Sequence, residues 1–321
     1  DYYWKKTKGW VVQAPVIATS GAEAPYINGG DVNNNGFELA LSWNDNIGKD
    51  FRYNIGANMA YNKNKVKNLK TADGIIHGST NVMFNNQREF YRISENHAMG
   101  YFWGYKTDGL FQTQEDIDNW VAAGNGIKSG TKPGDVRFVD LNHDGQINDD
   151  DKVDLGNGIP KWNFGFTAGF TYKNFDFNMV WSGMAGFKVA NGGYRNWGNA
   201  DQSNYTTRFL DRWTGPGTSN SIPRLVNGDI SWTDFSELYL ESGNFIRLAN
   251  VTLGYDFAPL LRAKFLSQLR LYFQAQNLFT LTNYSGMDPE VGFGQDAWMN
   301  GIDTGVYPHA RTFLFGVNVK F

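Results

Sequence analysis

Residues 162–172, with the sequence WNFGFTAGFTY, alternate strictly between two kinds of side chain. The even positions carry aromatic residues or alanine, and the odd positions carry asparagine, glycine or threonine. A period of two predicts a β-strand with one apolar and one polar face. The same alternation occurs at 37–44, 51–62, 175–182, 268–276 and 312–321, and further strands are expected near 2–10 and 245–257. The chain is therefore expected to be all-β, with eight strands.

The lengths of the strands and of their connections favour a membrane barrel over a soluble sandwich. Strands of about 9–13 residues are long enough to cross a bilayer at a tilt. Short connections at 45–50, 173–174 and 258–265 contrast with long ones at 11–35, 63–161, 187–243 and 281–310. Outer-membrane barrels combine short periplasmic turns with long extracellular loops. We therefore predict an antiparallel transmembrane β-barrel in which 63–161 and 187–243 are extracellular loop regions.

Composition excludes several other classes of protein. The net charge of -3 at pH 7 provides no basic field for nucleic acid. The chain has no cysteine, so it carries neither a disulfide framework nor a thiolate metal site. No window approaches about 18 consecutive apolar residues, which argues against a transmembrane helix. The first residues, DYYWKKTKGW, resemble the middle of a strand and do not resemble a signal peptide. We therefore expect this chain to be part of a longer protein.

The stretch DLNHDGQINDDD, residues 140–151, has the spacing of a calcium-binding loop. Oxygen-bearing side chains alternate along it, a glycine permits the sharp turn, and a carboxylate stands at the twelfth position. The flanking segments do not look like the helices of an EF-hand, since GDVRFV resembles a strand and KVDLGNGIPKW a turn. We predict a structural Ca²⁺ site with the ligands Asp140, Asn142, Asp144, Gln146, Asn148 and Asp151. The alternative is a polar turn closed by hydrogen bonds without metal.

Nothing in the sequence indicates a catalytic site. The four histidines lack metal-binding spacing, and no nucleophile motif or phosphate-binding loop is present. The carboxylates of Asp288 and Glu290 could suggest a glycosidase, but the intervening Pro289 fits a turn better. We therefore do not expect an enzyme.

Tryptophans outside the expected strand cores are candidates for contact with a ligand. Aromatic faces stack on sugar rings, and they also pack loops together or face a partner protein. The candidates are Trp103, Trp197 and Trp298. Because packing is the commoner role for any single tryptophan, the ligand-binding residues stay open.

Five segments, taken together, carry a resemblance to a known family. The longest runs from Gly134 to Gly183 and contains the acidic loop followed by WNFGFTAGFTYKNFDFNMVWSG. The others are GYKTDGLFQTQEDI, FIRLANVTLGYDF, LRLYFQAQNLFTLTNYSGMDPEV and YPHARTFLFGVNVKF. In this order, over nearly the whole chain, they resemble the SusC/RagA family of TonB-dependent outer-membrane transporters.

The resemblance implies an architecture and a role for the whole chain. Residues 1–321 would form the C-terminal part of a plugged 22-stranded barrel, contributing its last eight strands. The plug and the segment that contacts TonB would lie upstream. The implied role is energy-dependent import of oligosaccharides or oligopeptides across the outer membrane, with a SusD-like surface lipoprotein as a lid. The implied partners are that lipoprotein, TonB and the lipid bilayer, and no nucleic acid.

Two other classes of function remain open on the residues alone. Eight strands could close by themselves into a stand-alone outer-membrane adhesin or structural barrel. A secreted β-sandwich that binds calcium and carbohydrate would also show alternating strands. A connection of about a hundred residues between two strands argues against the small barrel, since ordinary loops are far shorter.

Overall fold

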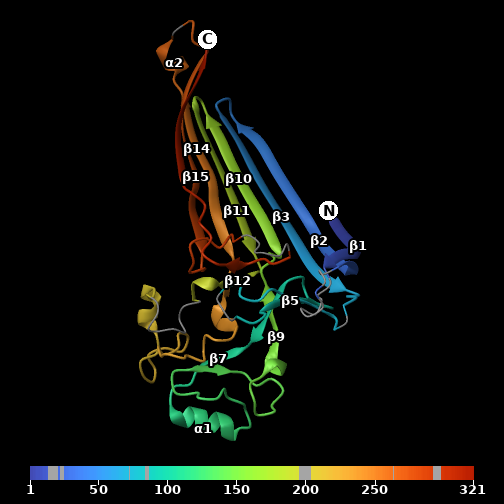
Figure 1. The fold of residues 1–321 in the computed structure, drawn as a ribbon. Coiled ribbons are helices and arrows are strands. Elements are labelled where there is room, and N and C mark those ends of the chain that lie inside the picture. The colour runs from blue at the N-terminus through green and yellow to red at the C-terminus, as the bar shows by residue number, and fades with distance from the viewer. Residues whose placement is uncertain are drawn as a thin grey trace.

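Eight long strands form one antiparallel sheet in the computed structural model, which describes residues 1–13, 21, 25–71, 73–83, 87–194, 204–262, 264–291 and 298–321. Their order in the sheet is their order in the chain (Figure 1). They are β1 (Tyr2–Gln13), β2 (Tyr26–Ile47), β3 (Phe51–Lys67), β10 (Trp162–Tyr172), β11 (Phe175–Ala185), β14 (Phe245–Asp256), β15 (Gln268–Thr282) and β17 (Thr312–Lys320). This confirms the eight expected strands, although β2 begins at Tyr26, well before the expected start at residue 37.

The register of the sheet matches apolar positions to apolar positions across neighbouring strands. Phe166 of β10 lies opposite Ala57 of β3 and Trp181 of β11. Phe273 of β15 likewise lies opposite Phe315 of β17. A shift of one residue would move every side chain of a strand to the other face, so the alternation seen in the sequence fixes the pairing.

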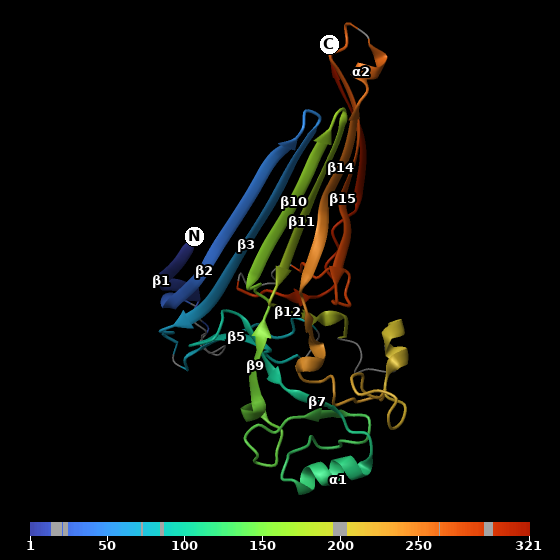
Figure 2. The same ribbon diagram turned by 180° about the vertical axis from the view of Figure 1, so that it is seen from behind.

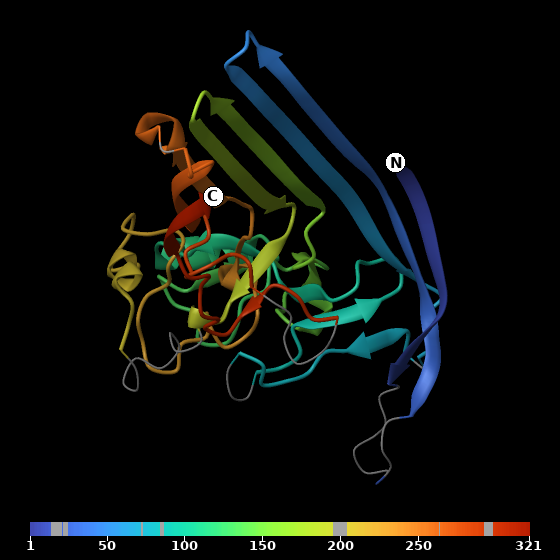
Figure 3. The same ribbon diagram turned by 90° about the horizontal axis from the view of Figure 1, so that it is seen from above.

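The sheet is curved and open (Figure 3). Strands β1 and β17 are its two edges, and in the described part of the chain no backbone pairing joins them. Unpaired strand edges expose a row of N–H and C=O groups, which proteins normally cover or pair. The sheet thus has the form of an arc cut from a larger closed surface.

Connections at the two ends of the sheet differ in length, as the sequence predicts. Residues 48–50, 173–174 and 257–267 make the short links, and the last of these includes α2 (Ala258–Leu261). The long connections, 14–25, 68–161, 186–244 and 283–311, all leave from the opposite end (Figures 1 and 2).

Three of the long connections fold together into a compact unit, here named the loop assembly: the described residues of 68–161, 186–244 and 283–311. Its strands are β4 (Ile75–His77), β5 (Tyr91–Ser94), β6 (Tyr101–Tyr105), β7 (Thr107–Leu110), β8 (Val136–Phe138), β9 (Lys152–Asn157), β12 (Lys188–Asn191), β13 (Leu240–Ser242) and β16 (Ile302–Asp303). Its helices are α1 (Gln114–Ala122) and the 3-10 turns η2 (Asp149–Asp151), η3 (Gly192–Tyr194), η4 (Thr207–Asp211) and η5 (Glu237–Tyr239). Strand β12 pairs with β13 and, in parallel, with β16, so two separate connections share one small sheet.

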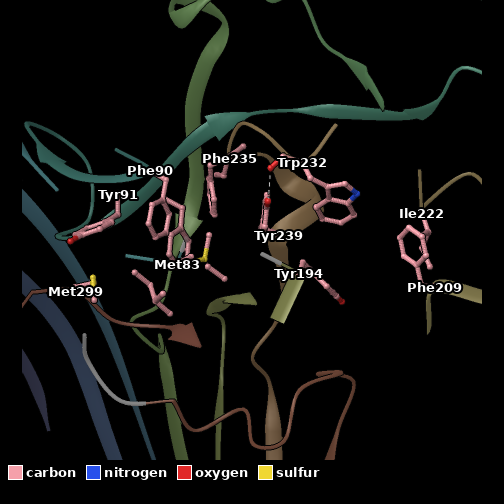
Figure 4. Close-up of a cluster of buried hydrophobic side chains, with 14 residues drawn as sticks. Met83, Phe90, Tyr91, Tyr194, Phe209, Ile222, Trp232, Phe235, Tyr239 and Met299 are labelled. Atoms are coloured by element: carbon pink, nitrogen blue, oxygen red, sulfur yellow. Dashed lines mark hydrogen bonds between the residues drawn. The ribbon is translucent and has the colours of Figure 1, made fainter. Parts of the chain in front are cut away.

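The loop assembly has a hydrophobic core of its own (Figure 4). Phe90 and Phe102 come from the first connection, Tyr239 from the second and Met299 from the third, and all four are almost completely buried. Phe90 also lies 4.6 Å from Phe235, ring centre to ring centre. Buried aromatic contacts of this size hold the three connections in fixed positions relative to each other.

Local signals place the one regular helix of this unit but miss an adjacent strand. The acidic start and terminal glycine of EDIDNWVAAG predict a helix, and α1 confirms it, capped by Thr113, whose hydroxyl accepts a hydrogen bond from the Asp116 backbone. The segment KVDLGN, expected as a turn, is strand β9, and this expectation was wrong. Strand β9 pairs with β6, and the paired residues Tyr105 and Lys152 are 47 positions apart in the chain. The strand therefore forms because of a tertiary contact and not because of a local sequence signal.

No helix in the described residues is both long enough and apolar enough to cross a membrane.

Candidate functional site

The apolar face of the eight-stranded sheet is the largest candidate interaction surface. The matched register makes this face continuous from β1 to β17. Many of its large side chains are exposed, among them Leu41, Trp43, Phe166, Leu253, Phe313, Phe315 and Val317. Soluble monomers rarely expose apolar patches beyond a few hundred Å². A surface this extensive requires an apolar environment.

Aromatic rings gather near both ends of that face. Toward the short links, the ring of Phe170 lies 5.7 Å from Phe51 and 5.4 Å from Phe177. Toward the loop assembly, the rings of Tyr61 and Trp162 lie 4.7 Å apart. Two aromatic belts flanking an apolar band are typical of membrane barrels.

The spacing of the two belts fits the thickness of a bilayer. Trp162 and Tyr172 stand at the two ends of the 11-residue strand β10. At about 3.3 Å per residue they are roughly 33 Å apart along the strand. A strand tilt of about 45° reduces this to about 23 Å, close to the apolar band of about 25 Å in outer-membrane barrels.

The opposite face of the sheet is polar and carries an ion pair across three strands. Arg270 of β15 donates two hydrogen bonds, of 2.8 and 2.6 Å, to the carboxylate of Asp176 on β11. The pair passes over Gly254 of β14, where a Cβ atom would come within 2.6 Å of both side chains. Bidentate charged pairs are costly in contact with lipid, so this face must meet water or polar protein groups.

The acidic loop over residues 140–151 is closed by hydrogen bonds to its own backbone. The carboxylate of Asp151, fully buried, accepts the N–H groups of Leu141 (2.8 Å) and Asn148 (2.9 Å). The carboxylate of Asp144 accepts the N–H of Gln146 at 2.8 Å. These contacts match the metal-free turn that the sequence analysis keeps as an alternative.

Asp140, at the first position of the loop, is less completely satisfied. Its side chain is fully buried, and Oδ2 accepts the N–H groups of Gly126 (2.8 Å) and Gly145 (2.9 Å). Oδ1 is buried and accepts no hydrogen bond from the described residues. Burial raises the pKa of Asp140, but the backbone donors outweigh it and hold the pKa below its usual value. A charged oxygen without a partner is costly in a protein interior, and a cation would satisfy it.

The other predicted ligands surround Asp140 without converging on it. Asn142 and Asn148 each use the side-chain oxygen to accept a backbone N–H two residues ahead. Among the described residues, one group of three acidic or histidine side chains has its ligand atoms within 4.8 Å of one another. That group lies outside the loop over residues 140–151. The donor set is suited to Ca²⁺, but its three carboxylates would have to move closer together to bind it.

The three candidate tryptophans have different surroundings. The ring of Trp103, in β6, is covered by the guanidinium of Arg92 at 3.3 Å and by the ammonium of Lys152 at 4.5 Å. Trp298 packs against Tyr91 with ring centres 5.1 Å apart. Trp197 lies outside the described residues. The contacts of Trp103 and Trp298 are those of packing residues. Their role in ligand binding stays a prediction.

The structure also assembles a charged cluster that the sequence analysis did not assign. Arg247, near the start of β14 and only 4% exposed, donates hydrogen bonds of 2.6 Å to both Asp288 and Glu290. His309 adds its ring nitrogen to Asp288 at 2.9 Å. Asp288, Glu290 and His309 are the group with ligand atoms within 4.8 Å, but the guanidinium of Arg247 already supplies the cation. The two carboxylates in the segment GMDPEV were the sequence signal for this cluster. Pro289 lies between them in the turn.

Comparison with known proteins gives relatives that are TonB-dependent receptors. No family model matches the chain. It is 30% identical to TonB-dependent receptor P3 of Formosa agariphila and 26% identical to TonB-dependent receptor SusC of Bacteroides thetaiotaomicron. Both matches cover 100% of this chain, but only 32% and 30% of those proteins, so the chain spans about a third of their length.

Solved structures agree with this assignment at the level of the fold. The structure of the RagAB peptide transporter matches 100% of this chain with a TM-score of 0.75 and 21% sequence identity, over 33% of that chain. The RagAB peptide importer in the 'closed-closed' state matches with a TM-score of 0.74. The open arc of eight strands therefore has the fold of about one third of that longer chain. Over its whole length the chain is therefore similar in sequence to TonB-dependent receptors, SusC among them, and it shares the fold of the RagAB peptide transporter.

Proposed function

We propose that this chain is the C-terminal barrel portion of a TonB-dependent importer in the outer membrane. The complete protein would take up oligosaccharides or oligopeptides, with energy delivered through TonB and with a SusD-like lipoprotein as a lid. The chain itself would supply part of the lipid-facing wall, part of the polar inner face and part of the extracellular loops. It would do no covalent chemistry.

The continuous apolar face, bounded by two aromatic belts, carries this proposal. It supports a bilayer as the partner of that face, because the belt spacing of about 23 Å fits an outer-membrane barrel. The polar face, with the Arg270–Asp176 pair, suits a lumen filled with water or with a plug. The similarity to TonB-dependent receptors supports a receptor function, and the shared fold with the RagAB peptide transporter supports import.

The alternatives fit the structure less well. A stand-alone barrel of eight strands would need pairing between β1 and β17, and the described strands form an open arc. A sandwich needs two large sheets packed face to face. Here the sheets outside the main one have at most four strands, and they belong to the loop assembly.

Deletion of the full-length gene tests the proposed function. The deletion strain should lose growth on one class of oligosaccharide or oligopeptide as the sole nutrient, while growth on the corresponding monomers is kept. The wild-type gene should restore growth, whereas a version without the expected N-terminal TonB-contacting segment should not. Equal growth with and without that segment would contradict TonB-dependent import.

We also propose that the loop over residues 140–151 binds Ca²⁺ in a structural role. The unpartnered Oδ1 of Asp140 and the oxygen-rich spacing support this. Bound Ca²⁺ would draw Asp144 and Asp151 toward Asp140 and stiffen the connection between β8 and β9. This would hold part of the extracellular surface in shape.

A double substitution tests the calcium site. Asp140→Ala with Asp144→Ala should make residues 135–155 several times more sensitive to limited proteolysis and should abolish the effect of a calcium chelator on cleavage. The exposed Asp150, whose side chain is not a predicted ligand, provides the matched control Asp150→Asn. If chelation and the double substitution both leave cleavage in this segment unchanged, the loop is a metal-free turn.

A further inference from the structure

Lysines continue the apolar face of the sheet beyond the aromatic belt that lies nearer the loop assembly. Strand β3 pairs with β10 only as far as Tyr61, opposite Trp162, and then runs on beside β2 to Lys67 (Figure 1). The pairing of β2 with β3 has no register shift, so Lys63, Lys65 and Lys67 lie on the same face as Tyr61. Three lysines therefore follow the belt at every second position of one strand.

The opposite face of this extension of β3 is already covered by protein. Val66 is fully buried and packs in a cluster with Ile76 and Ile93 of the loop assembly. The side-chain oxygen of Asn64 accepts the backbone N–H of Met99 at 2.9 Å. Because successive side chains of a strand point to opposite faces, the three lysines are directed away from the loop assembly. They belong to the outer surface of the sheet.

Neighbouring strands complete a polar surface around these lysines. Two rows of paired residues cross β3, β2 and β1 on this face: Lys63, Asn35 and Trp4 in the first, and Lys65, Asn33 and Lys6 in the second. Lys63 is exposed, Lys65 is half-buried, and Trp4 is 70% exposed. Lys6, Lys63, Lys65 and Lys67 are here named the lysine patch.

The lysine patch carries more positive charge than nearby carboxylates balance. Its one ion pair within the described residues joins Lys6 to Asp31 at 3.9 Å. Lys67 donates a hydrogen bond to the neutral amide oxygen of Asn96, and the side chains of the other two lysines have no such partner in the described residues. Ammonium groups on one face of a strand repel each other, and an anion between them would relieve this repulsion.

Protection of a sheet edge does not explain the patch. Lysines on edge strands prevent pairing with other chains, and this could account for Lys6 on β1. Strand β3, however, lies inside the sheet between β2 and β10. Lys63 and Lys65 therefore need another reason to share the outer face with the aromatic belt.

The height of the patch matches the headgroup layer of a membrane. Lys63 and Lys65 stand two and four residues beyond Tyr61, at about 3.3 Å per residue. A strand tilt of about 45° places them roughly 5 and 9 Å beyond the belt. The polar layer on each side of the hydrocarbon core is roughly 5–8 Å thick, and a flexible lysine stem can reach into it.

We infer that the lysine patch binds a phosphorylated glycolipid of the outer leaflet, an inference that rests on the membrane orientation in the proposed function. A phosphate monoester carries roughly 1.5 to 2 negative charges near neutral pH and three acceptor oxygens, so it can be shared by Lys63 and Lys65. A phosphodiester headgroup offers less charge to the same lysines. The amide of Asn35 and the exposed ring of Trp4, in the row of Lys63, suit the sugar of the headgroup.

Native mass spectrometry of the full-length protein in detergent tests the patch. The probe is a disaccharide glycolipid with two phosphate monoesters. Lys63→Gln with Lys65→Gln should weaken its binding by about tenfold to thirtyfold, since each lysine near an anionic lipid surface contributes roughly a fivefold factor. Lys63→Arg with Lys65→Arg keeps both charges and should bind like wild type. Lys106→Gln with Lys132→Gln removes two exposed lysines of the loop assembly and should have no effect.

Two further lipids establish what the patch recognises. The same glycolipid without its phosphates should bind wild type about as weakly as the phosphorylated form binds the glutamine variant, and phosphatidylglycerol should bind wild type less tightly than the phosphorylated glycolipid. The inference is overturned if the glutamine variant keeps its affinity, if removal of the phosphates changes nothing, or if phosphatidylglycerol binds as tightly. Unchanged proteolysis of the glutamine variant shows that a loss of binding does not come from misfolding.

The growth assay separates this inference from the proposed function. Glycolipid binding that does not depend on the lysines, in a protein whose deletion abolishes growth on an oligomeric nutrient, would refute the patch alone. Lysine-dependent binding by a protein whose deletion leaves growth unchanged would refute the import function alone.

Discussion

Replacing Arg247 with alanine should release the connection between β15 and β17 and destabilise it locally by about 3–5 kcal/mol. Arg247 is the shared cation of Asp288 and Glu290, and its side chain is 5% exposed. Without it, the buried carboxylate of Asp288 loses the positive charge of Arg247 while it stays desolvated. Breaking a buried pair on one side costs far more than an exposed salt bridge contributes.

Hydrogen exchange in the full-length protein measures this local effect. Amides of residues 285–291 should exchange roughly a hundredfold to several thousandfold faster in Arg247→Ala, as 3–5 kcal/mol implies. Arg262→Ala, at the opposite end of the sheet, should not change them. Adding Asp288→Asn to Arg247→Ala should recover part of the loss, because the orphaned charge is removed. Unchanged exchange in Arg247→Ala would show that the cluster does not hold this connection.

Replacing Asp229 with asparagine should stabilise the loop assembly at neutral pH. The side chain of Asp229 is 1% exposed, and Oδ2 is buried without a hydrogen bond. Burial, with a smaller contribution from the nearby charge of Asp135, raises the pKa of Asp229 to about 6. A shift of about two pKa units corresponds to about 3 kcal/mol, so ionisation of this group opposes folding by that order.

The sign of the pH dependence follows from the two pKa values. In the unfolded chain Asp229 titrates near 3.8, and in the folded protein near 6. The neutral form favours folding, so the group imposes no penalty below about pH 4, and the stability is progressively lost as pH rises to 6. Asp229→Asn should remove this decline and raise the stability above pH 6.

Unfolding of the loop assembly followed from pH 4 to 8 checks this prediction. Asp234→Asn is the contrasting variant. Burial raises the pKa of Asp234, but the ammonium of Lys128, 2.6 Å away, outweighs it and holds the pKa below its usual value. Loss of that charge should therefore destabilise the protein at neutral pH. The account of Asp229 would be wrong if its asparagine variant were less stable than wild type at pH 7 and kept the decline between pH 4 and 6.

The main sheet could be predicted from the sequence because its signal is local. The alternation within each strand shows which residues lie on its apolar face and which on its polar face. Aligning the apolar faces of neighbouring strands then restricts their register, as with Phe166 between Ala57 and Trp181. The loop assembly could not be predicted in this way. Its core joins Phe90 to Phe235 and Met299, which lie far apart in the chain and share no period. In the sequence its parts are recognisable only as separate loops.

The candidate sites show the same division. Spacing alone identified the loop at 140–151 as a possible calcium site, but the hydrogen bonds that close it around Asp151 depend on backbone geometry. The partner of Asp288 and Glu290 is an arginine about forty residues earlier, so Pro289 could suggest a turn but not its contact.

Labelling of two adjacent residues in β14 tests the central claim, that the apolar face meets lipid. The chain has no cysteine, so Leu253→Cys on the apolar face and Thr252→Cys on the polar face can each carry a single fluorophore, with any cysteine elsewhere in the full-length protein replaced by serine. In reconstituted bilayers, lipids brominated in the acyl chain should quench the label at residue 253 strongly and the label at residue 252 weakly. Equal quenching at both positions, or stronger quenching at 252, would contradict a membrane-spanning sheet with this orientation.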